Sequence, residues 1–204
     1  MDSMIADHLS HNDPILARLV EQYGKDLHTP SQTNSTNFIE ELCETIVSQQ
    51  LSVKAASTIW GRARANVKDW NNPVLILDCD DLVLRQAGLS GQKVSYVKNI
   101  ARAVMDGTLH PDSYLRLPEQ EIIDELVKVK GIGVWTAEMF LIFSLGREDV
   151  FSIGDLGLRN AIKKHYGSLD AEAMQELSLR WAPYRSYASL LLWKSLGNEP
   201  LKTP

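Results

Sequence analysis

The sequence predicts an all-α fold, and three features of the chain indicate it. Apolar residues recur at helical spacing through most of its length, as on helices with one buried face. No segment longer than a few residues alternates apolar and polar side chains, which is the pattern of a half-buried strand. Ser, Asp or Pro stands before the periodic segments and Gly follows several of them, in the places where helices begin and end.

In the first half of the chain, capping residues and breakers separate the expected helices. Residues 1–12 are expected to form a loose terminus, and Asp13, followed by proline, is an N-cap. The polar stretch 28–37 is a predicted loop, and 71–73 (Asn-Asn-Pro) is a predicted break. Ser52 and Ser90 can cap the helices that follow them. Helices are expected from residue 14 past 20, and over 38–47, 53–67, 80–86 and 92–105.

Proline, glycine and aspartate divide the second half in the same way. Pro111 and Pro118 punctuate the stretch before a further helix. Asp155 and Asp170 can each cap a helix, and Gly197 closes the last one. Helices are expected over 119–127, 135–145, 156–165, 171–181 and 184–196.

Composition and charge exclude several classes of protein. Of 204 residues, 44% are hydrophobic and 23% are charged, which excludes disorder and fibrous repeats. No apolar run approaches the ~20 residues that span a bilayer, and residues 1–14 lack the basic and apolar regions of a secretory signal. Cys43 and Cys79 are too few for a disulfide framework or a four-cysteine metal site. We therefore expect an intracellular protein without a membrane partner. The net charge of −5 argues against retention on nucleic acid by bulk charge, though not against a local contact surface.

The sharpest local signal is a glycine turn between two helices, Lys130-Gly131-Ile132-Gly133. Two glycines spaced in this way permit positive φ and close approach of the backbone. The N–H groups at the start of the following helix have no intrahelical acceptor, so they can bind a phosphate oxygen. By itself, the pattern fits a plain glycine-terminated turn in a helical hairpin equally well.

Four segments carry a resemblance to a known family. They are 46–56 (IVSQQLSVKAA), 126–137 (LVKVKGIGVWTA), 150–159 (VFSIGDLGLR) and 181–188 (WAPYRSYA), the last of which leads to Trp193. In this order, they resemble the motifs of the helix–hairpin–helix DNA glycosylase superfamily. The last segment resembles the WxPxRSxA…W signature of its alkylbase, or 3-methyladenine DNA glycosylase II, family. The resemblance covers about residues 36–195, and its one departure is Lys130, where proline is common.

The resemblance implies a helix–hairpin–helix glycosylase fold, in which two helical lobes flank a cleft. Residues 1–35 would pack on the C-terminal lobe, 36–149 would form the lobe that carries the hairpin, and 150–204 would complete the second lobe. The implied function is excision of alkylated purines of the 3-methyladenine and 7-methylguanine class in base excision repair. The partner would be duplex DNA, the enzyme a monomer, and the compartment the cytoplasm of a prokaryote or the nucleus of a eukaryote. Two alternatives are a catalytically silent helix–hairpin–helix module that binds DNA or a protein, and an unrelated helical interaction domain.

By the resemblance, Asp155 is the catalytic carboxylate. Cleavage of an N-glycosidic bond builds positive charge at the sugar, which a fixed anion stabilises, and an alkylated purine is already cationic and leaves without a general acid. A plain N-cap is the alternative for Asp155, and Asp149 is a competing candidate that we interpret as a solvated helix-end residue. Trp135 stands where bifunctional relatives carry a lysine nucleophile. Tryptophan forms no Schiff base, so no lyase activity is expected.

The resemblance also implies a pocket for the flipped base, because a cationic purine binds to electron-rich aromatic faces. The candidates are Trp135, Met139, Phe143, Ser144 and Trp193. Core packing is the alternative for each of them. Trp60, Trp70 and Trp181 are interpreted as structural residues.

Further residues are expected to touch DNA. Gly131, Gly133 and Thr136 belong to the hairpin, and one residue of the turn Gln50-Leu51-Ser52 would fill the gap that the flipped base leaves. Lys93 can touch a phosphate, although a plain helix cap fits its segment as well. No cofactor is required by the resemblance, but main-chain carbonyls of the hairpin hold Na+ or K+ in relatives. The matching positions are Val127, Val129 and Ile132.

Overall fold

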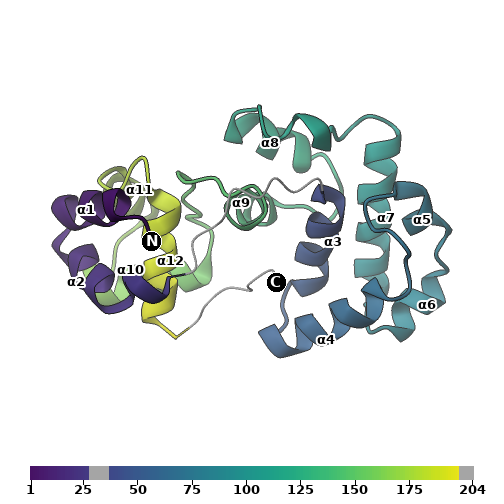
Figure 1. The fold of residues 1–204 in the computed structure, drawn as a ribbon, viewed down its shortest axis with the longest axis horizontal. Coiled ribbons are helices and arrows are strands. Elements are labelled where there is room, and N and C mark those ends of the chain that lie inside the picture. Colours follow the sequence, from purple (N-terminus) through teal and green to yellow (C-terminus); the bar gives the residue numbers. More distant parts are fainter. Residues whose placement is uncertain (28–36, 198–204) are drawn as a thin grey trace. The chain divides into compact units, whose positions relative to one another are not determined.

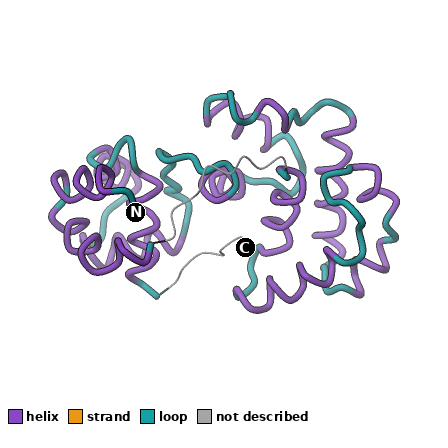
Figure 2. Tube along the Cα trace, in the orientation of Figure 1, coloured by secondary structure: helices purple, strands orange, loops and turns teal. Residues whose placement is uncertain are grey.

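A computed structural model describes residues 1–27 and 37–197, and its described part confirms the all-α prediction. Helices and loops account for all of this part, which contains no strand (Figure 2). None of the helices described is long and apolar enough to cross a membrane. The predicted loop 28–37 lies outside the described residues except for Asn37.

The described residues divide into two compact units. The terminal unit comprises 1–27 and 146–197, and the central unit comprises 37–145 (Figure 1). The helices of the terminal unit are α1 (Ser3–Asn12), α2 (Pro14–Tyr23), α10 (Leu156–Tyr166), α11 (Ala171–Leu179) and α12 (Arg185–Ser195), with a 3-10 turn η1 (Gly24–Asp26). Those of the central unit are α3 (Phe38–Ser48), α4 (Val53–Arg64), α5 (Pro73–Asp78), α6 (Asp81–Gln86), α7 (Gly91–Met105), α8 (Glu119–Leu126) and α9 (Val134–Phe143), with a 3-10 turn η2 (Pro111–Ser113).

Helix α12 forms the core of the terminal unit, where it packs against both α2 and α10. Nearly all its residues are buried, which leaves it without the amphipathic pattern of a surface helix. The N-terminal and C-terminal parts of the chain therefore share one core.

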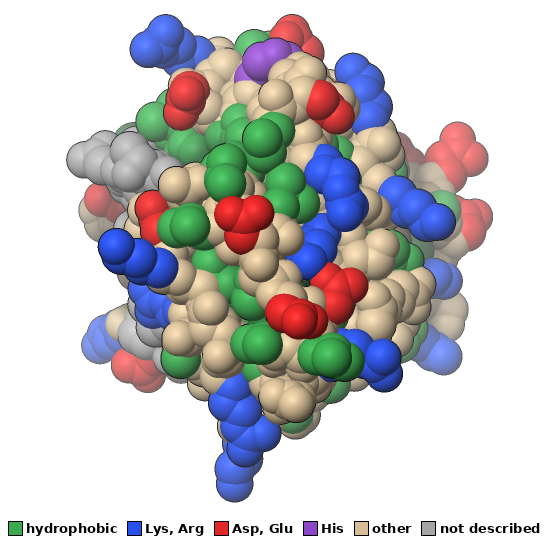
Figure 3. Space-filling view, turned by 90° about the vertical axis from the view of Figure 1, so that its right-hand side faces the viewer, with side chains coloured by type: hydrophobic (Ala, Val, Ile, Leu, Met, Phe, Trp, Pro, Cys, Tyr) green, Lys and Arg blue, Asp and Glu red, His purple; other side chains and the backbone are tan. Residues whose placement is uncertain are grey.

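The core of the central unit forms around α3, which packs against α4, α7 and α9. Helix α9 is apolar on most of its surface, and six of its ten residues are buried. Acidic and basic side chains are interspersed on the face of this unit shown in Figure 3, so that face carries no field of a single sign.

The predicted N-caps are confirmed. In each, a side-chain oxygen accepts a hydrogen bond from an N–H of the first turn, at Asp13, Ser52, Ser90, Asp155 and Asp170. Capping is a local interaction, so the sequence within a few residues suffices to predict it.

Two helices were not predicted. Residues 1–12 are not a loose terminus but form α1, which Asp2 caps by accepting a hydrogen bond from the Met4 N–H at 2.8 Å. Only two residues of this helix are buried, so its apolar pattern is too sparse to recognise. Residues 71–72 do lie in a break between α4 and α5, but helix α5 itself was not predicted; Asn72 caps it and Pro73 occupies its first position.

Candidate active site

The glycine turn joins α8 to α9 and is fastened to α7. Gly131 has φ +114°, and a Cβ there would overlap the ring of Tyr96, a residue of α7. The Asn99 side chain, one turn further along α7, donates a hydrogen bond to the Lys130 carbonyl at 3.0 Å. Glycine at this position is therefore required both by the backbone and by the ring beside it. Sequence reasoning missed Tyr96 and Asn99, because nothing local links α7 to the hairpin.

Gly133 is the N-cap of α9 and supplies no side chain to its first turn. The N–H groups of that turn have no intrahelical acceptor, and a Cβ at Gly133 would meet nothing within 4 Å. The two glycines therefore differ: Gly131 shapes the turn, whereas Gly133 leaves the helix N-terminus open to a ligand.

The predicted residues of α9 differ in exposure. Trp135 is 38% exposed, Phe143 is half-buried, and Met139 and Ser144 are buried. Thr136 is only 3% exposed, and its hydroxyl accepts a hydrogen bond from the Gln49 side chain at 2.9 Å. The Thr136 side chain is therefore too buried to contact DNA. The predicted DNA contact of this residue is limited to its main-chain N–H.

The turn after α3 lies beside α9 and α7. Gln50 is exposed and has φ +58°, an unusual conformation for a residue other than glycine. Leu51 is half-buried, and Ser52 is exposed and caps α4. Which of the three would fill the gap left by a flipped base stays open.

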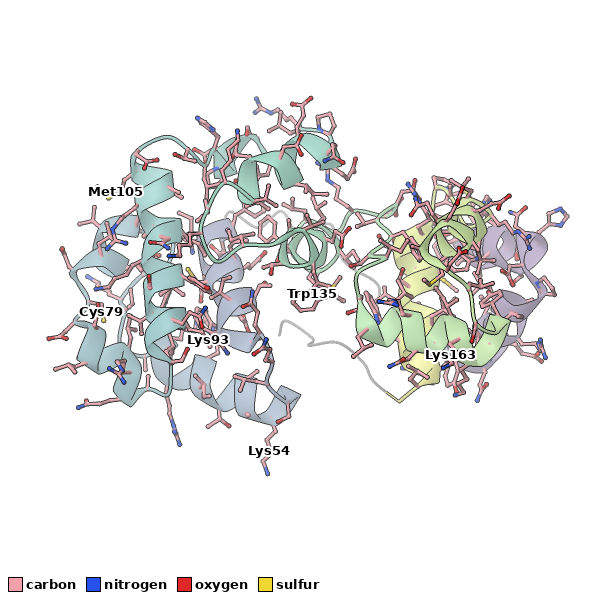
Figure 4. All side chains as sticks on the ribbon, turned by 180° about the vertical axis from the view of Figure 1, so that it is seen from behind. Lys54, Cys79, Lys93, Met105, Trp135 and Lys163 are labelled. Carbon is pink, nitrogen blue, oxygen red and sulfur yellow. The ribbon has the colours of Figure 1, made fainter. Side chains whose placement is uncertain are left out.

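Lys93 has a structural partner that the sequence did not reveal. Its ammonium donates hydrogen bonds to the main-chain carbonyls of Val47 and Gln49, at 2.7 and 2.8 Å, and so caps the C-terminal end of α3 (Figure 4). Burial lowers the pKa of this lysine. The predicted phosphate contact would therefore have to share an ammonium group that already holds the turn in place.

In the terminal unit, residues 146–155 form a strap that ends at Asp155. Side chains of α12 hold this strap in place by hydrogen bonds. Arg185 holds Asp149 with two side-chain hydrogen bonds, Nε to Oδ1 at 2.7 Å and Nη2 to Oδ2 at 2.9 Å. The fully buried Ser186 hydroxyl donates to the Arg147 carbonyl at 2.6 Å and accepts from the Val150 N–H at 3.0 Å. The interpretation of Asp149 as a solvated residue was wrong, because its partner lies 36 residues away in the sequence. It fixes the strap.

Asp155 ends the strap as the N-cap of α10. Its Oδ1 accepts hydrogen bonds from the Leu158 N–H at 2.6 Å and from the indole N–H of Trp193 at 2.8 Å. A Cβ at Gly157 would lie 3.1 Å from that oxygen and 3.2 Å from the indole ring, so glycine permits the close approach. Trp193 is 3% exposed, whereas Asp155 is half-buried. The carboxylate is therefore both a cap and an oriented anion.

The predicted cation site would use only main-chain oxygens. The Val129 carbonyl accepts a hydrogen bond from the Ile132 N–H at 3.0 Å and keeps a second lone pair, so it can still serve as a ligand. No group of three His, Cys, Asp or Glu side chains that could hold a metal ion occurs among the residues described. The monovalent cation stays a prediction.

Comparisons with known proteins identify the family of this chain. Residues 43–183 match the family model described as HhH-GPD superfamily base excision DNA repair protein. DNA-3-methyladenine glycosylase 1 of Schizosaccharomyces pombe is 35% identical over 195 residues, covering 92% of this chain and 85% of that protein. A Bacillus subtilis relative is also 35% identical, and this chain spans 56% of its length.

Two solved structures are similar along most of both chains. The S. pombe 3-methyladenine DNA glycosylase in complex with abasic DNA has a TM-score of 0.84 and 33% identity, covering 96% of this chain and 97% of that one. A DNA-3-methyladenine glycosidase from Bacillus halodurans has a TM-score of 0.74 and 37% identity, with 90% and 87% covered. The family resemblance of the four segments is thereby confirmed, and the chain belongs to the HhH-GPD superfamily of base excision DNA repair proteins.

Proposed function

We propose that this protein is a monofunctional DNA glycosylase, which hydrolyses the N-glycosidic bond of alkylated purines of the 3-methyladenine and 7-methylguanine class. The observation that carries the proposal is the Asp155 carboxylate, oriented by the Trp193 indole at the end of a clamped strap. The names of the relatives, DNA-3-methyladenine glycosylases, support the substrate class. The proposed enzyme acts as a monomer on duplex DNA, in the cytoplasm of a prokaryote or the nucleus of a eukaryote.

The proposed mechanism needs one carboxylate. As the bond to the base lengthens, positive charge develops on the sugar, and a fixed anion beside it lowers the energy of that state. The alkylated purine carries its own positive charge and leaves as a neutral base, so a second carboxyl group acting as an acid is not needed. Two donors hold Oδ1 of Asp155, so the carboxylate is oriented before substrate arrives, and it can align the attacking water.

The proposed base pocket uses aromatic surface. Trp135 is exposed on the first turn of α9, where its ring can stack on a cationic base. Met139 and Ser144 are buried and Phe143 is half-buried, so we assign these three residues to the shape of the pocket rather than to direct stacking. Trp193 has two proposed roles, since its N–H orients Asp155 and its ring is proposed to contribute to the base pocket.

The function is tested by product analysis on a duplex that contains 7-methylguanine. The expected products are free 7-methylguanine and an intact strand with an abasic site. Because Trp135 replaces a lysine nucleophile, borohydride should trap no protein–DNA adduct. A bifunctional lysine-containing glycosylase serves as the positive control for trapping. Binding to DNA without base release would instead favour the silent module, and efficient trapping would show that another amine forms a covalent intermediate.

The proposed DNA contact of the hairpin can be tested at Gly133. Gly133→Asp places a negative charge where a phosphate would bind, and we expect roughly tenfold weaker binding to damaged and undamaged duplex alike. Gly133→Ala is the matched control, because its Cβ meets nothing within 4 Å, and it should bind like the parent. With ~3–5 phosphates contacted, the parent's slope of log affinity against log salt should be roughly −3 to −4. A slope near zero, or normal binding by Gly133→Asp, would remove the hairpin from the DNA interface.

A further inference from the structure

The terminal unit contains a hollow of ≈ 260 Å³ between α10 and the loop that follows it. Its floor is apolar and includes the buried Ile162 and Met174. Its rim is polar and carries Arg159, Asn160, Lys163 and Ser168, and no acidic side chain lines it. Figure 4 labels Lys163 on α10.

The two cations of this rim are not used within the structure. Neither the Arg159 guanidinium nor the Lys163 ammonium hydrogen-bonds to or pairs with another residue that the structure describes, and both residues are exposed. By contrast, their neighbour Lys164 donates to the Ser195 carbonyl at 2.8 Å. Lys163 lies in the last turn of α10, where the helix dipole favours a cation, but Arg159 is the fourth residue of the helix, near the N-terminal end, where the dipole does not favour a cation.

Both cations lie on the face of α10 that starts at the proposed catalytic residue. Arg159 follows Asp155 by four residues and Lys163 follows it by eight, so the three share one side of the helix. Along the axis, the two cations lie about 6 and 12 Å from Asp155. A DNA strand whose flipped nucleotide reaches Asp155, and which continues along this face, would meet them in turn.

We propose that this hollow binds the sugar–phosphate backbone of the DNA strand that carries the damaged base, beyond the flipped nucleotide. Arg159 and Lys163 contact phosphate oxygens, and the Asn160 amide and the Ser168 hydroxyl are further donors of the kind that phosphates accept. The apolar floor fits the carbon face of a deoxyribose. This inference rests on the proposed function, and it assigns to the terminal unit a DNA contact separate from the hairpin of the central unit.

The test compares two double variants of equal charge. Arg159→Ala/Lys163→Ala removes the proposed contact, and Arg18→Ala/Lys25→Ala removes two exposed cations elsewhere in the same unit. Each double variant changes the net charge from −5 to −7, by loss of two positive charges. Affinity for a duplex with a stable abasic-site analogue is measured across a salt series, and thermal melting checks that the variants are folded.

We expect the first variant to bind roughly tenfold more weakly at 0.1 M salt, with a salt slope reduced in magnitude by about 1.8, or ~0.9 for each lost phosphate contact. The control should keep the parent's slope. If both double variants bind DNA equally well, the inference is overturned. This result is also expected if the hollow binds an acidic protein segment and not DNA. Should the double variant not fold, Lys163→Gln alone should reduce the slope by about 0.9.

Release of 7-methylguanine by the parent protein is measured in the same preparation. A parent that releases no base contradicts the proposed function, whatever the variants do. A parent that releases base, while the first variant binds like the control, contradicts only the contact proposed for the hollow.

Discussion

Replacement of Asp155 by asparagine is expected to slow excision of 7-methylguanine by roughly 10²–10³-fold, the usual effect of losing one preorganised electrostatic contact. Asparagine keeps an oxygen that can accept from the Leu158 N–H and the Trp193 indole, so the cap and the fold should survive. What it removes is the negative charge. The measurement is the single-turnover rate of base release with enzyme in excess, alongside thermal melting of both proteins.

Trp193→Phe provides the comparison, because it keeps the anion and removes the indole N–H, one of the two donors that hold Oδ1, together with part of the ring volume. We expect roughly tenfold slower excision in the parent background and little further loss when Asp155→Asn is already present, since the two residues act as one unit. If Asp155→Asn stays within a few-fold of the parent, Asp155 is only a helix cap and the proposed mechanism is wrong. Independent, additive losses would show that Trp193 acts on the base rather than through Asp155.

The local sequence was sufficient to predict most of the helices. A cap such as Asp170 and the N–H that donates to it lie within four residues, and a buried stripe repeats along the same helix. The same reasoning failed at α1, where only Ile5 and Leu9 are buried and the helix depends on packing against α2. It also missed α5, because Asn72 and Pro73 were interpreted only as a break and not also as the cap and the first residue of a helix.

The sequence predicted which residues form the candidate site, but not how these residues contact one another. Motif order pointed to Asp155 and Trp193 separately, yet their hydrogen bond joins residues 38 positions apart. The same holds for Asp149 and Arg185, and for Tyr96 behind Gly131. In each case, the partner lies on another helix and leaves no trace near the residue that it holds. Sequence can therefore nominate a residue for chemistry, whereas its orientation depends on tertiary packing.

Asp13 has a second structural role beyond the N-cap that its neighbours in the sequence predict. As expected, its Oδ1 caps α2, accepting from the N–H groups of Ile15 and Leu16. Its Oδ2, however, accepts from the Tyr166 hydroxyl at 2.9 Å and from the Trp181 indole N–H at 3.0 Å. The carboxylate is only 1% exposed. Burial, together with the negative charge of Asp13, raises the pKa of Tyr166, so this hydroxyl stays a donor.

Asp13→Ala is therefore expected to lower the free energy of unfolding by about 3–5 kcal/mol, far more than the ~1 kcal/mol of an ordinary cap. It would leave the Trp181 N–H buried without an acceptor, in addition to uncapping α2. Asp2→Ala is the control, because Asp2 is also an N-cap but is exposed, and its loss should cost about 1 kcal/mol or less. Urea unfolding of the three proteins measures both effects, and equal losses at the two caps would contradict the role of the buried network.

The hydrogen bonds of Asp13 also connect to the strap that carries Asp155, since the Trp181 ring packs edge-on against Phe151 of the strap, with centroids 5.8 Å apart. Without its hydrogen bond to Asp13, the Trp181 ring should be held less firmly, and the strap that carries Asp155 should be positioned less precisely. The folded fraction of Asp13→Ala should therefore excise 7-methylguanine more slowly than the folded fraction of Asp2→Ala.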